Sequence, residues 1–130
     1  MIIDIISLNR LQMQIIRRDN MRIAIIGSRN KNIENLEKYL PDSISEIISG
    51  GAKGIDTTAK NYALAHQIKL TEFLPEYSKY GKSAPLKRNQ EIVNASDLII
   101  AFWDGQSRGT KYAIDYAISL DKEIKIVILK

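Results

Sequence analysis

Three glycine-containing turns carry the residues of this chain whose types and spacing could do chemistry. The first holds Gly27, Ser28 and Arg29, the second spans residues 49–56, and the third spans residues 104–110. Each turn stands where an apolar run ends and a helical pattern begins. Glycine there lets the backbone approach a ligand, and the following helix offers free N–H groups and the positive end of its dipole. The three turns together predict a site for a phosphate-bearing ligand.

The candidate ligand-binding residues are those of the three turns, two residues of a later helix and one aromatic residue at a strand end. They are Gly27, Ser28, Arg29, Ser49, Gly50, Gly51, Lys53, Gly54, Asp56, Arg88, Asn89, Trp103, Asp104, Ser107, Gly109 and Thr110. Hydroxyl and basic groups suit a phosphate, carboxylates suit ribose hydroxyls, and an indole suits stacking on a base. Each residue also has a purely structural interpretation, as a tight turn, a helix cap, a solvated charge or a buried aromatic.

Alternating apolar runs and helical patterns indicate the elements that must position these turns. Strands are predicted over 22–26, 44–48, 68–74, 98–102 and 124–129, helices over 32–40, 55–66, 85–95 and 110–120, and a loop over 76–84. This alternation predicts an α/β fold, a Rossmann-like three-layer α/β/α sandwich with a mostly parallel five-stranded sheet in the order 3-2-1-4-5. Ligands bind such sheets at the carboxyl ends of the strands, where the strand order reverses. All three turns are therefore expected to meet at one place.

Residues 1–20 differ from the rest of the chain, because short isoleucine-rich runs alternate there with charged residues. They fit neither a membrane span nor a signal peptide. We expect a single nucleotide-binding domain over residues 21–130, preceded by an N-terminal extension over residues 1–20. The extension is predicted to be dispensable, or to add a strand or helix that docks on a partner.

Composition narrows the function classes. The chain has no cysteine, which excludes disulfides and thiolate chemistry and suits a cytoplasmic location. His66 is the sole histidine, so no metal site is expected. The net charge of +4 is mild, with Lys79, Lys82, Lys87 and Arg88 gathered in one acid-free stretch. Such a stretch favours anions without by itself indicating nucleic acid.

Four motifs in order resemble the SLOG superfamily of Rossmann-like domains. They are residues 21–29, residues 48–56, the pair Arg88-Asn89 and residues 97–110. The superfamily includes DNA-processing protein A, the LOG-type phosphoribohydrolases and the YpsA/YspA-like proteins, and the chain looks most similar to the stand-alone YspA type. The resemblance implies a domain that binds nucleotides or ligands derived from them. Some members hydrolyse N-glycosidic bonds, some hold single-stranded DNA, and some act as ligand sensors.

One departure from the LOG type bears on catalysis. LOG-type enzymes carry a catalytic glutamate three residues after the threonine of the third turn, and this chain has Ala113 there. Cleavage of a ribosyl–base bond passes through an oxocarbenium-like state that needs a well-placed carboxylate. Asp104 and Asp115 are the candidates to replace it, with Asp56 as a further one, so the sequence leaves enzymatic activity open.

The sequence leaves three functions open. The first is binding of a small nucleotide or nucleotide-derived ligand, with a role as a sensor and no other cofactor. The second is hydrolysis or transfer at an N-glycosidic or phosphoribosyl bond. The third is binding of single-stranded DNA. No membrane partner is expected, and self-association into a homo-oligomer is the expected assembly.

Overall fold

The computed structural model describes residues 21–129 and the backbone of residues 2–5. Its strands are β1 (Ile2–Ile5), β2 (Arg22–Gly27), β3 (Glu46–Ser49), β4 (Lys69–Glu72), β5 (Leu98–Trp103) and β6 (Glu123–Ile128). Its α-helices are α2 (Ile55–Ala65), α3 (Tyr77–Tyr80), α4 (Ala84–Ala95) and α5 (Arg108–Ser119), and its 3-10 helices are η1 (Leu36–Tyr39) and η2 (Gly81–Ser83). In the described part of the chain, no helix is long and apolar enough to span a membrane.

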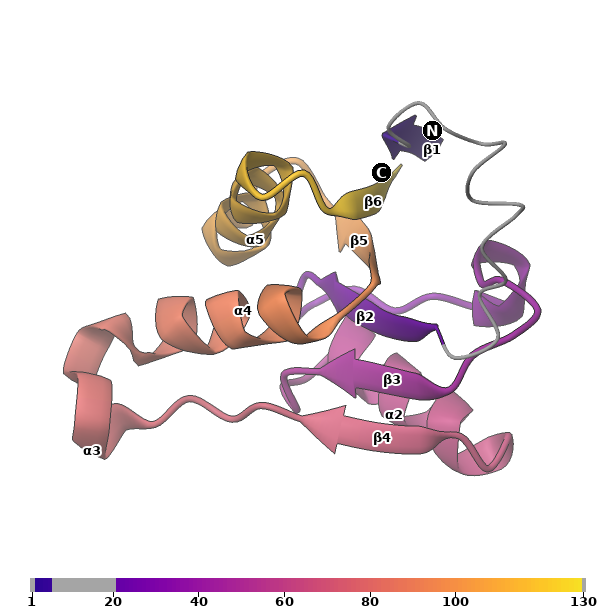
Figure 1. The fold of residues 1–130 in the computed structure, drawn as a ribbon, viewed down its shortest axis with the longest axis horizontal. Coiled ribbons are helices and arrows are strands. Elements are labelled where there is room, and N and C mark those ends of the chain that lie inside the picture. The colour runs from indigo at the N-terminus through magenta and orange to yellow at the C-terminus, as the bar shows by residue number, and fades with distance from the viewer. Residues whose placement is uncertain (1, 6–20, 130) are drawn as a thin grey trace.

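The strands form one sheet in the order β1-β6-β5-β2-β3-β4 (Figure 1). β2 to β6 run parallel to one another, which confirms the predicted Rossmann-like fold and the order of its five strands. β1 adds a sixth, antiparallel edge strand, in register from Ile2 opposite Val127 to Ile5 opposite Ile124. The first residues of the predicted extension therefore pair with the chain's own last strand. Residues 6–20 lie outside the described part, and the domain boundary at Met21 stays a prediction.

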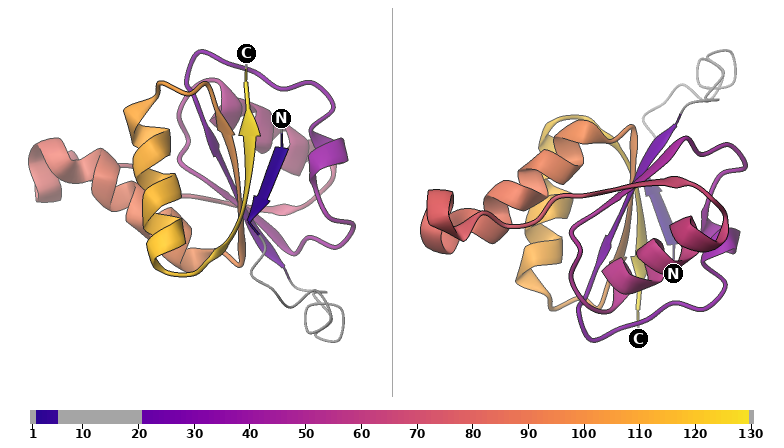
Figure 2. Two further views of the ribbon diagram at one scale, coloured as in Figure 1. Left: turned by 90° about the horizontal axis from the view of Figure 1, so that it is seen from above. Right: turned by 90° about the horizontal axis from the view of Figure 1, so that it is seen from below.

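Helices cover both faces of the sheet, with α2 and η1 on one side and α4 and α5 on the other (Figure 2). Alternate residues of each central strand supply the two cores, because neighbouring side chains of a strand point to opposite faces. Ile23 and Ile25 of β2 pack toward α2, whereas Ala24 and Ile26 pack toward α4 and α5. Burial on both faces explains why these strands are apolar without interruption.

Two predictions about the connections were wrong. The helix expected over residues 32–40 is only the single 3-10 turn η1, because Asn35 adopts a left-handed conformation (φ 56°) immediately before it. The loop expected over residues 76–84 contains the short helices α3 and η2. We call residues 77–83 the arm, since they project beyond the sheet at the start of α4 (Figure 1).

The amino end of β2 is tied to that of β5 by Arg22 and Asp97. The carboxylate of Asp97 accepts hydrogen bonds from the Arg22 backbone N–H at 2.9 Å, from Nε at 3.3 Å and from Nη2 at 3.2 Å. Burial opposes ionisation of Asp97, but the hydrogen bonds from Arg22 outweigh it, so the pKa of Asp97 lies below its usual value.

This pair predicts a loss of stability at acid pH. A carboxyl group whose pKa is lowered by folding stabilises the protein above its unfolded pKa, and that contribution is lost as the pH falls through the folded pKa. Asp97→Asn is expected to cost about 1 kcal/mol or less at pH 7, since the pair is partly exposed. Urea unfolding between pH 7 and pH 3 measures this, with Asp42→Asn, at an exposed position, as the control. If the stability lost in Asp97→Asn relative to wild type does not shrink toward pH 3, the stabilising role of the Arg22–Asp97 pair is contradicted.

Candidate functional site

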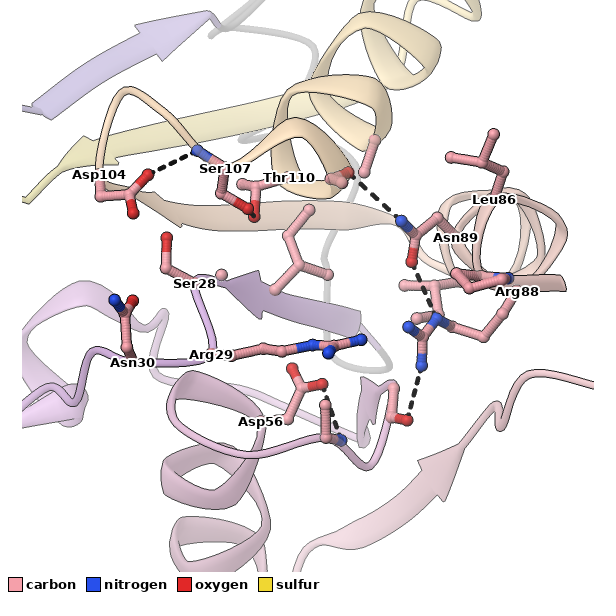
Figure 3. Close-up of a pocket in the computed structure, with 18 residues that line it drawn as sticks. Ser28, Arg29, Asn30, Asp56, Leu86, Arg88, Asn89, Asp104, Ser107 and Thr110 are labelled. Carbon is pink, nitrogen blue, oxygen red and sulfur yellow. Dashed lines mark hydrogen bonds between the residues drawn. The ribbon is translucent and has the colours of Figure 1, made fainter. Parts of the chain in front are cut away.

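A pocket of about 350 Å³ opens at the carboxyl ends of the parallel strands, where β2 and β5 lie side by side (Figure 3). All three glycine turns and the start of α4 contribute to its walls. The predicted residues that line it are Gly27, Ser28, Arg29, Gly50, Asp56, Arg88, Asn89, Asp104, Ser107, Gly109 and Thr110. The fold thus brings together residues from all four predicted motifs, as the strand order requires.

Five other candidate ligand-binding residues do not line this pocket: Ser49, Gly51, Lys53, Gly54 and Trp103. Trp103 is half-buried, and its indole N–H donates to the Ser107 carbonyl at 3.0 Å. This hydrogen bond stabilises the conformation of the third turn. Gly54 has φ 73°, and a Cβ there would lie 2.2 Å from the Arg29 carbonyl oxygen. The absence of a side chain at Gly54 therefore allows the first and second turns to pack closely against each other.

The third turn folds around Asp104. Its Oδ1 accepts the backbone N–H groups of Gln106 at 2.9 Å and Ser107 at 2.8 Å. The N–H groups of Ser107 and Gln106 hold the pKa of Asp104 below its usual value. The turn leads into α5, whose first backbone N–H groups have no partner within the helix and whose first turn has no acidic residue. Anions are favoured at such a helix start.

Ser28 stands opposite the start of α5. Its backbone N–H donates to the Phe102 carbonyl at 3.3 Å, which holds the first turn against the end of β5. Ser28 is only 2% exposed, and its hydroxyl makes no hydrogen bond of normal length among the described residues, although the Ser28 side chain lies near enough to Asp104 to lower the pKa of that carboxyl. In Figure 3 this hydroxyl points toward the wall that carries Asp104. A buried hydroxyl without a normal hydrogen bond is costly, so this group needs an explanation.

Asp56 is a buried carboxylate at the start of α2, and its Oδ2 accepts the Ala52 N–H at 3.0 Å. Burial raises the pKa of Asp56, while that hydrogen bond and the charges of Arg88 and Arg29 oppose the rise. The two arginines place positive charge beside the Asp56 carboxylate, and Glu72 adds a negative charge nearby. Arg29 is exposed and free to reach a ligand, whereas Arg88 is buried.

Arg88 and Asn89 link the second and third turns by a chain of hydrogen bonds, which we call the α4 relay (Figure 3). Arg88 Nη1 donates to the Gly50 carbonyl at 2.8 Å, and its Nε donates to Asn89 Oδ1 at 2.9 Å. Asn89 Nδ2 then donates to the Gly109 carbonyl at 3.3 Å. Burial lowers the pKa of Arg88, and the charge of Asp56 opposes this.

The sequence reasoning missed several pocket residues. Asn30 follows Arg29 in the first turn and could have been included on that ground. Pro85 and Leu86 form the wall at the start of α4, and Leu86 is 40% exposed, a position where an apolar ligand surface would rest. The remaining ones are Ile26, Ala52 and Ile92, and Ala113 also lines the pocket, at the position where the resemblance places the LOG-type glutamate. Ala52 lies inside the second turn and could have been included, whereas Ile26 and Ile92 carry no sequence signal that separates them from the core.

Asp115 lies outside the pocket on the exposed face of α5. Its carboxylate is paired with Lys111 Nζ at 2.7 Å, one helical turn away. His66 is exposed at the end of α2 and stacks on Tyr62, with ring centroids 4.0 Å apart. Neither residue is placed to act on a ligand in the pocket.

Comparison with family models finds one that matches, DNA recombination-mediator protein A, over residues 13–76. The matched stretch contains the first two glycine turns, and these lie beside the third turn on a sheet with the expected strand order. The match and the fold confirm the resemblance to the SLOG superfamily. Neither the curated proteins nor the solved structures yield a match to the chain. The match ends before α4, β5 and α5, so the third turn and the residues Arg88 and Asn89 of the α4 relay lie outside it.

Proposed function

We propose that the pocket binds a nucleotide or nucleotide-derived ligand through a phosphate group held between the start of α5 and Arg29. The observation that carries this proposal is the Ser28 hydroxyl, which is buried at the pocket and makes no hydrogen bond of normal length among the described residues, although it lies near enough to the Asp104 carboxylate to lower the pKa of that group. A phosphate oxygen would accept its hydrogen bond, together with the free N–H groups at the start of α5.

The other walls support a ligand larger than phosphate. Asp104 and Asn30 supply polar groups that suit ribose hydroxyls, and Pro85 and Leu86 supply an apolar surface that suits the face of a base. The volume of about 350 Å³ lies near the lower end of small-molecule pockets, which favours a mononucleotide over a dinucleotide. In this proposal the domain senses or processes such a compound.

Ser28→Ala tests the proposal because stability and affinity should respond differently. Removal of a buried hydroxyl that makes no normal hydrogen bond is expected to leave the melting temperature unchanged or higher. Loss of a hydrogen bond to a charged phosphate is expected to weaken binding about 10-fold. Thermal shift and calorimetry with AMP, ADP, ATP, ADP-ribose and NAD measure both quantities on the full chain.

Ser96→Ala is the matched control. Ser96 is also fully buried, but it does not line the pocket, and its hydroxyl shares its proton between the Ile92 and Val93 carbonyls at 3.0 and 3.1 Å. This change is expected to cost about 1 kcal/mol of stability and to leave ligand affinity unaltered. Absence of binding by every compound of the panel would contradict the proposed function.

Single-stranded DNA is the second candidate ligand, favoured by the match to a DNA recombination mediator. The arm adds exposed Lys79 and Lys82, and Lys87 follows at the start of α4, next to Leu86 of the pocket. Tyr80 contacts two of these lysines, with Lys79 Nζ 5.1 Å and Lys87 Nζ 5.9 Å from its ring centroid. Binding of a 20-nucleotide single strand with steep salt dependence, and no binding of mononucleotides, would favour DNA.

A further inference from the structure

Asp56 is a buried carboxylate in the pocket wall that no cation neutralises by direct contact. The residue is 8% exposed, and its Oδ2 accepts a single hydrogen bond, from the Ala52 N–H at 3.0 Å. In the part of the chain that the structure describes, no ion pair joins it to an arginine or lysine. Burial with so little compensation favours the neutral, protonated form of a carboxyl group. Burial accordingly raises the pKa of Asp56, against the opposing effects of the Ala52 N–H and of Arg88.

The charges that act on Asp56 come from three other elements. Arg29 belongs to the first turn, Glu72 to β4 and Arg88 to α4. Lys53, in the same turn as Asp56, is exposed and does not line the pocket. With Asp56 ionised, the two arginines and the two carboxylates cancel in charge. With Asp56 protonated, the same four side chains carry a net positive charge, which attracts an anionic ligand.

The two arginines differ in their freedom to move. Arg88 is held by the Gly50 carbonyl at 2.8 Å and by Asn89 Oδ1 at 2.9 Å, so it cannot approach Asp56 without breaking the α4 relay. Arg29 is exposed, and in Figure 3 its side chain extends into the pocket beside Asp56. A phosphate bound to Arg29 would therefore bring negative charge close to Asp56 and stabilise a proton on its carboxyl group.

We propose that Asp56 is a protonation switch of the pocket, whose protonated form binds a phosphate-bearing ligand more tightly than its ionised form. This inference rests on the proposed function, because it needs a phosphate at Arg29. It adds regulation to that function, since the ligand binds together with a proton and its affinity rises as the pH falls. By linkage, the bound ligand strengthens proton binding at Asp56 by the same factor.

The effect of Asp56 can be separated from that of other titrating groups. His66 is exposed at the end of α2 and does not line the pocket. Asp104 lines the pocket, but the N–H groups of Ser107 and Gln106 hold its pKa below the usual value, so it stays ionised near neutral pH. A phosphate monoester itself gains a proton at about pH 6 and then binds cations less well, which is the opposite trend. Comparison of two protein variants with the same ligand cancels this contribution.

The test compares the full-length wild type with Asp56→Asn by calorimetry, using AMP and ADP-ribose at pH 5, 6, 7 and 8. Asparagine is uncharged, like protonated aspartate, and its oxygen can still accept the Ala52 N–H. The variant is expected to bind about 10-fold more tightly than wild type at pH 8, and this difference should shrink toward pH 5. Asp115→Asn, an exposed aspartate outside the pocket, is the matched control and is expected to leave affinity unaltered at every pH.

A second measurement needs only the wild type. Binding of ADP-ribose is expected to take up part of a proton, which appears as a binding enthalpy that depends on the ionisation enthalpy of the buffer. ADP-ribose is the probe because its two phosphates are linked on both sides and exchange no proton between pH 5 and pH 8. The same proton uptake sets the slope of its affinity against pH.

Two results would overturn the switch while leaving the proposed function intact. One is an Asp56→Asn variant that binds more weakly than wild type at pH 8, or whose affinity relative to wild type is the same at every pH. The other is binding of ADP-ribose without proton uptake anywhere between pH 5 and pH 8. Absence of binding by both compounds would instead count against the proposed function, and the switch would fall with it.

Discussion

Gly54→Ala is expected to destabilise the domain by about 3 to 4 kcal/mol, which corresponds to a drop in melting temperature of roughly 10 °C or more. The positive φ of Gly54 accounts for about 1 kcal/mol of this loss. The larger share is steric, because the new Cβ would lie 2.2 Å from the Arg29 carbonyl oxygen and 2.7 Å from that of Ser28. Both obstacles are backbone atoms, so relief requires the first turn to separate from the second.

Gly81→Ala provides the matched control for this prediction. Gly81 also has a positive φ of 57°, but a Cβ there meets no atom within 4 Å. Its substitution carries the conformational cost alone, about 1 kcal/mol. Equal losses in the two variants, measured by thermal and urea unfolding, would show that the contact between the turns is not tight.

Arg88→Met is expected to lower the free energy of unfolding by about 2 to 3 kcal/mol at pH 7 and to weaken ligand binding. The buried carbonyl of Gly50 loses its hydrogen bond, and Asp56 loses a nearby positive charge. Arg88→Lys should recover only part of the loss, since an ammonium cannot reproduce the separate Nε and Nη1 bonds. Lys87→Met, an exposed neighbour on α4, should change stability by less than about 0.5 kcal/mol.

The Arg88→Met deficit should depend on pH in a defined direction. Burial already raises the pKa of Asp56 in the folded protein, and loss of Arg88 raises it further. A carboxyl group with a raised folded pKa contributes most to stability below its unfolded pKa, and that contribution is lost as the pH rises through the folded pKa. The deficit relative to wild type should therefore shrink between pH 7 and pH 4. A deficit that grows toward pH 4 would contradict the proposed role of Arg88.

The strands and the place of the pocket could be predicted from the sequence because each depends on local patterns. A strand buried on both faces must be a short apolar run, and Ile23 to Ile26 form such a run ended by Gly27. The parallel order then brings the turns after β2 and β5 together. Eleven of the sixteen candidate ligand-binding residues line the pocket for this reason.

The features that the sequence did not predict depend mostly on contacts between residues far apart in the chain. The reason for a glycine at position 54 is the Arg29 carbonyl, and the reason for burial of Arg88 is the Gly50 carbonyl, far away in the chain. The helical pattern over residues 32–40 failed because Asn35 adopts the left-handed conformation that asparagine tolerates better than most residues. The arm was missed because a four-residue helix is too short to show periodicity.

The α4 relay has a thermodynamic consequence. Arg88 and Asn89 join the turn that carries Gly50 to the turn that carries Gly109, so neither turn can shift without straining the same two side chains. Groups of a ligand that bind at the two turns would therefore have a coupling free energy, and two separate fragments would help or hinder each other's binding. Linkage makes that effect reciprocal and equal in size in both directions. A ligand group bound at one of the two turns would therefore change the affinity of the other turn.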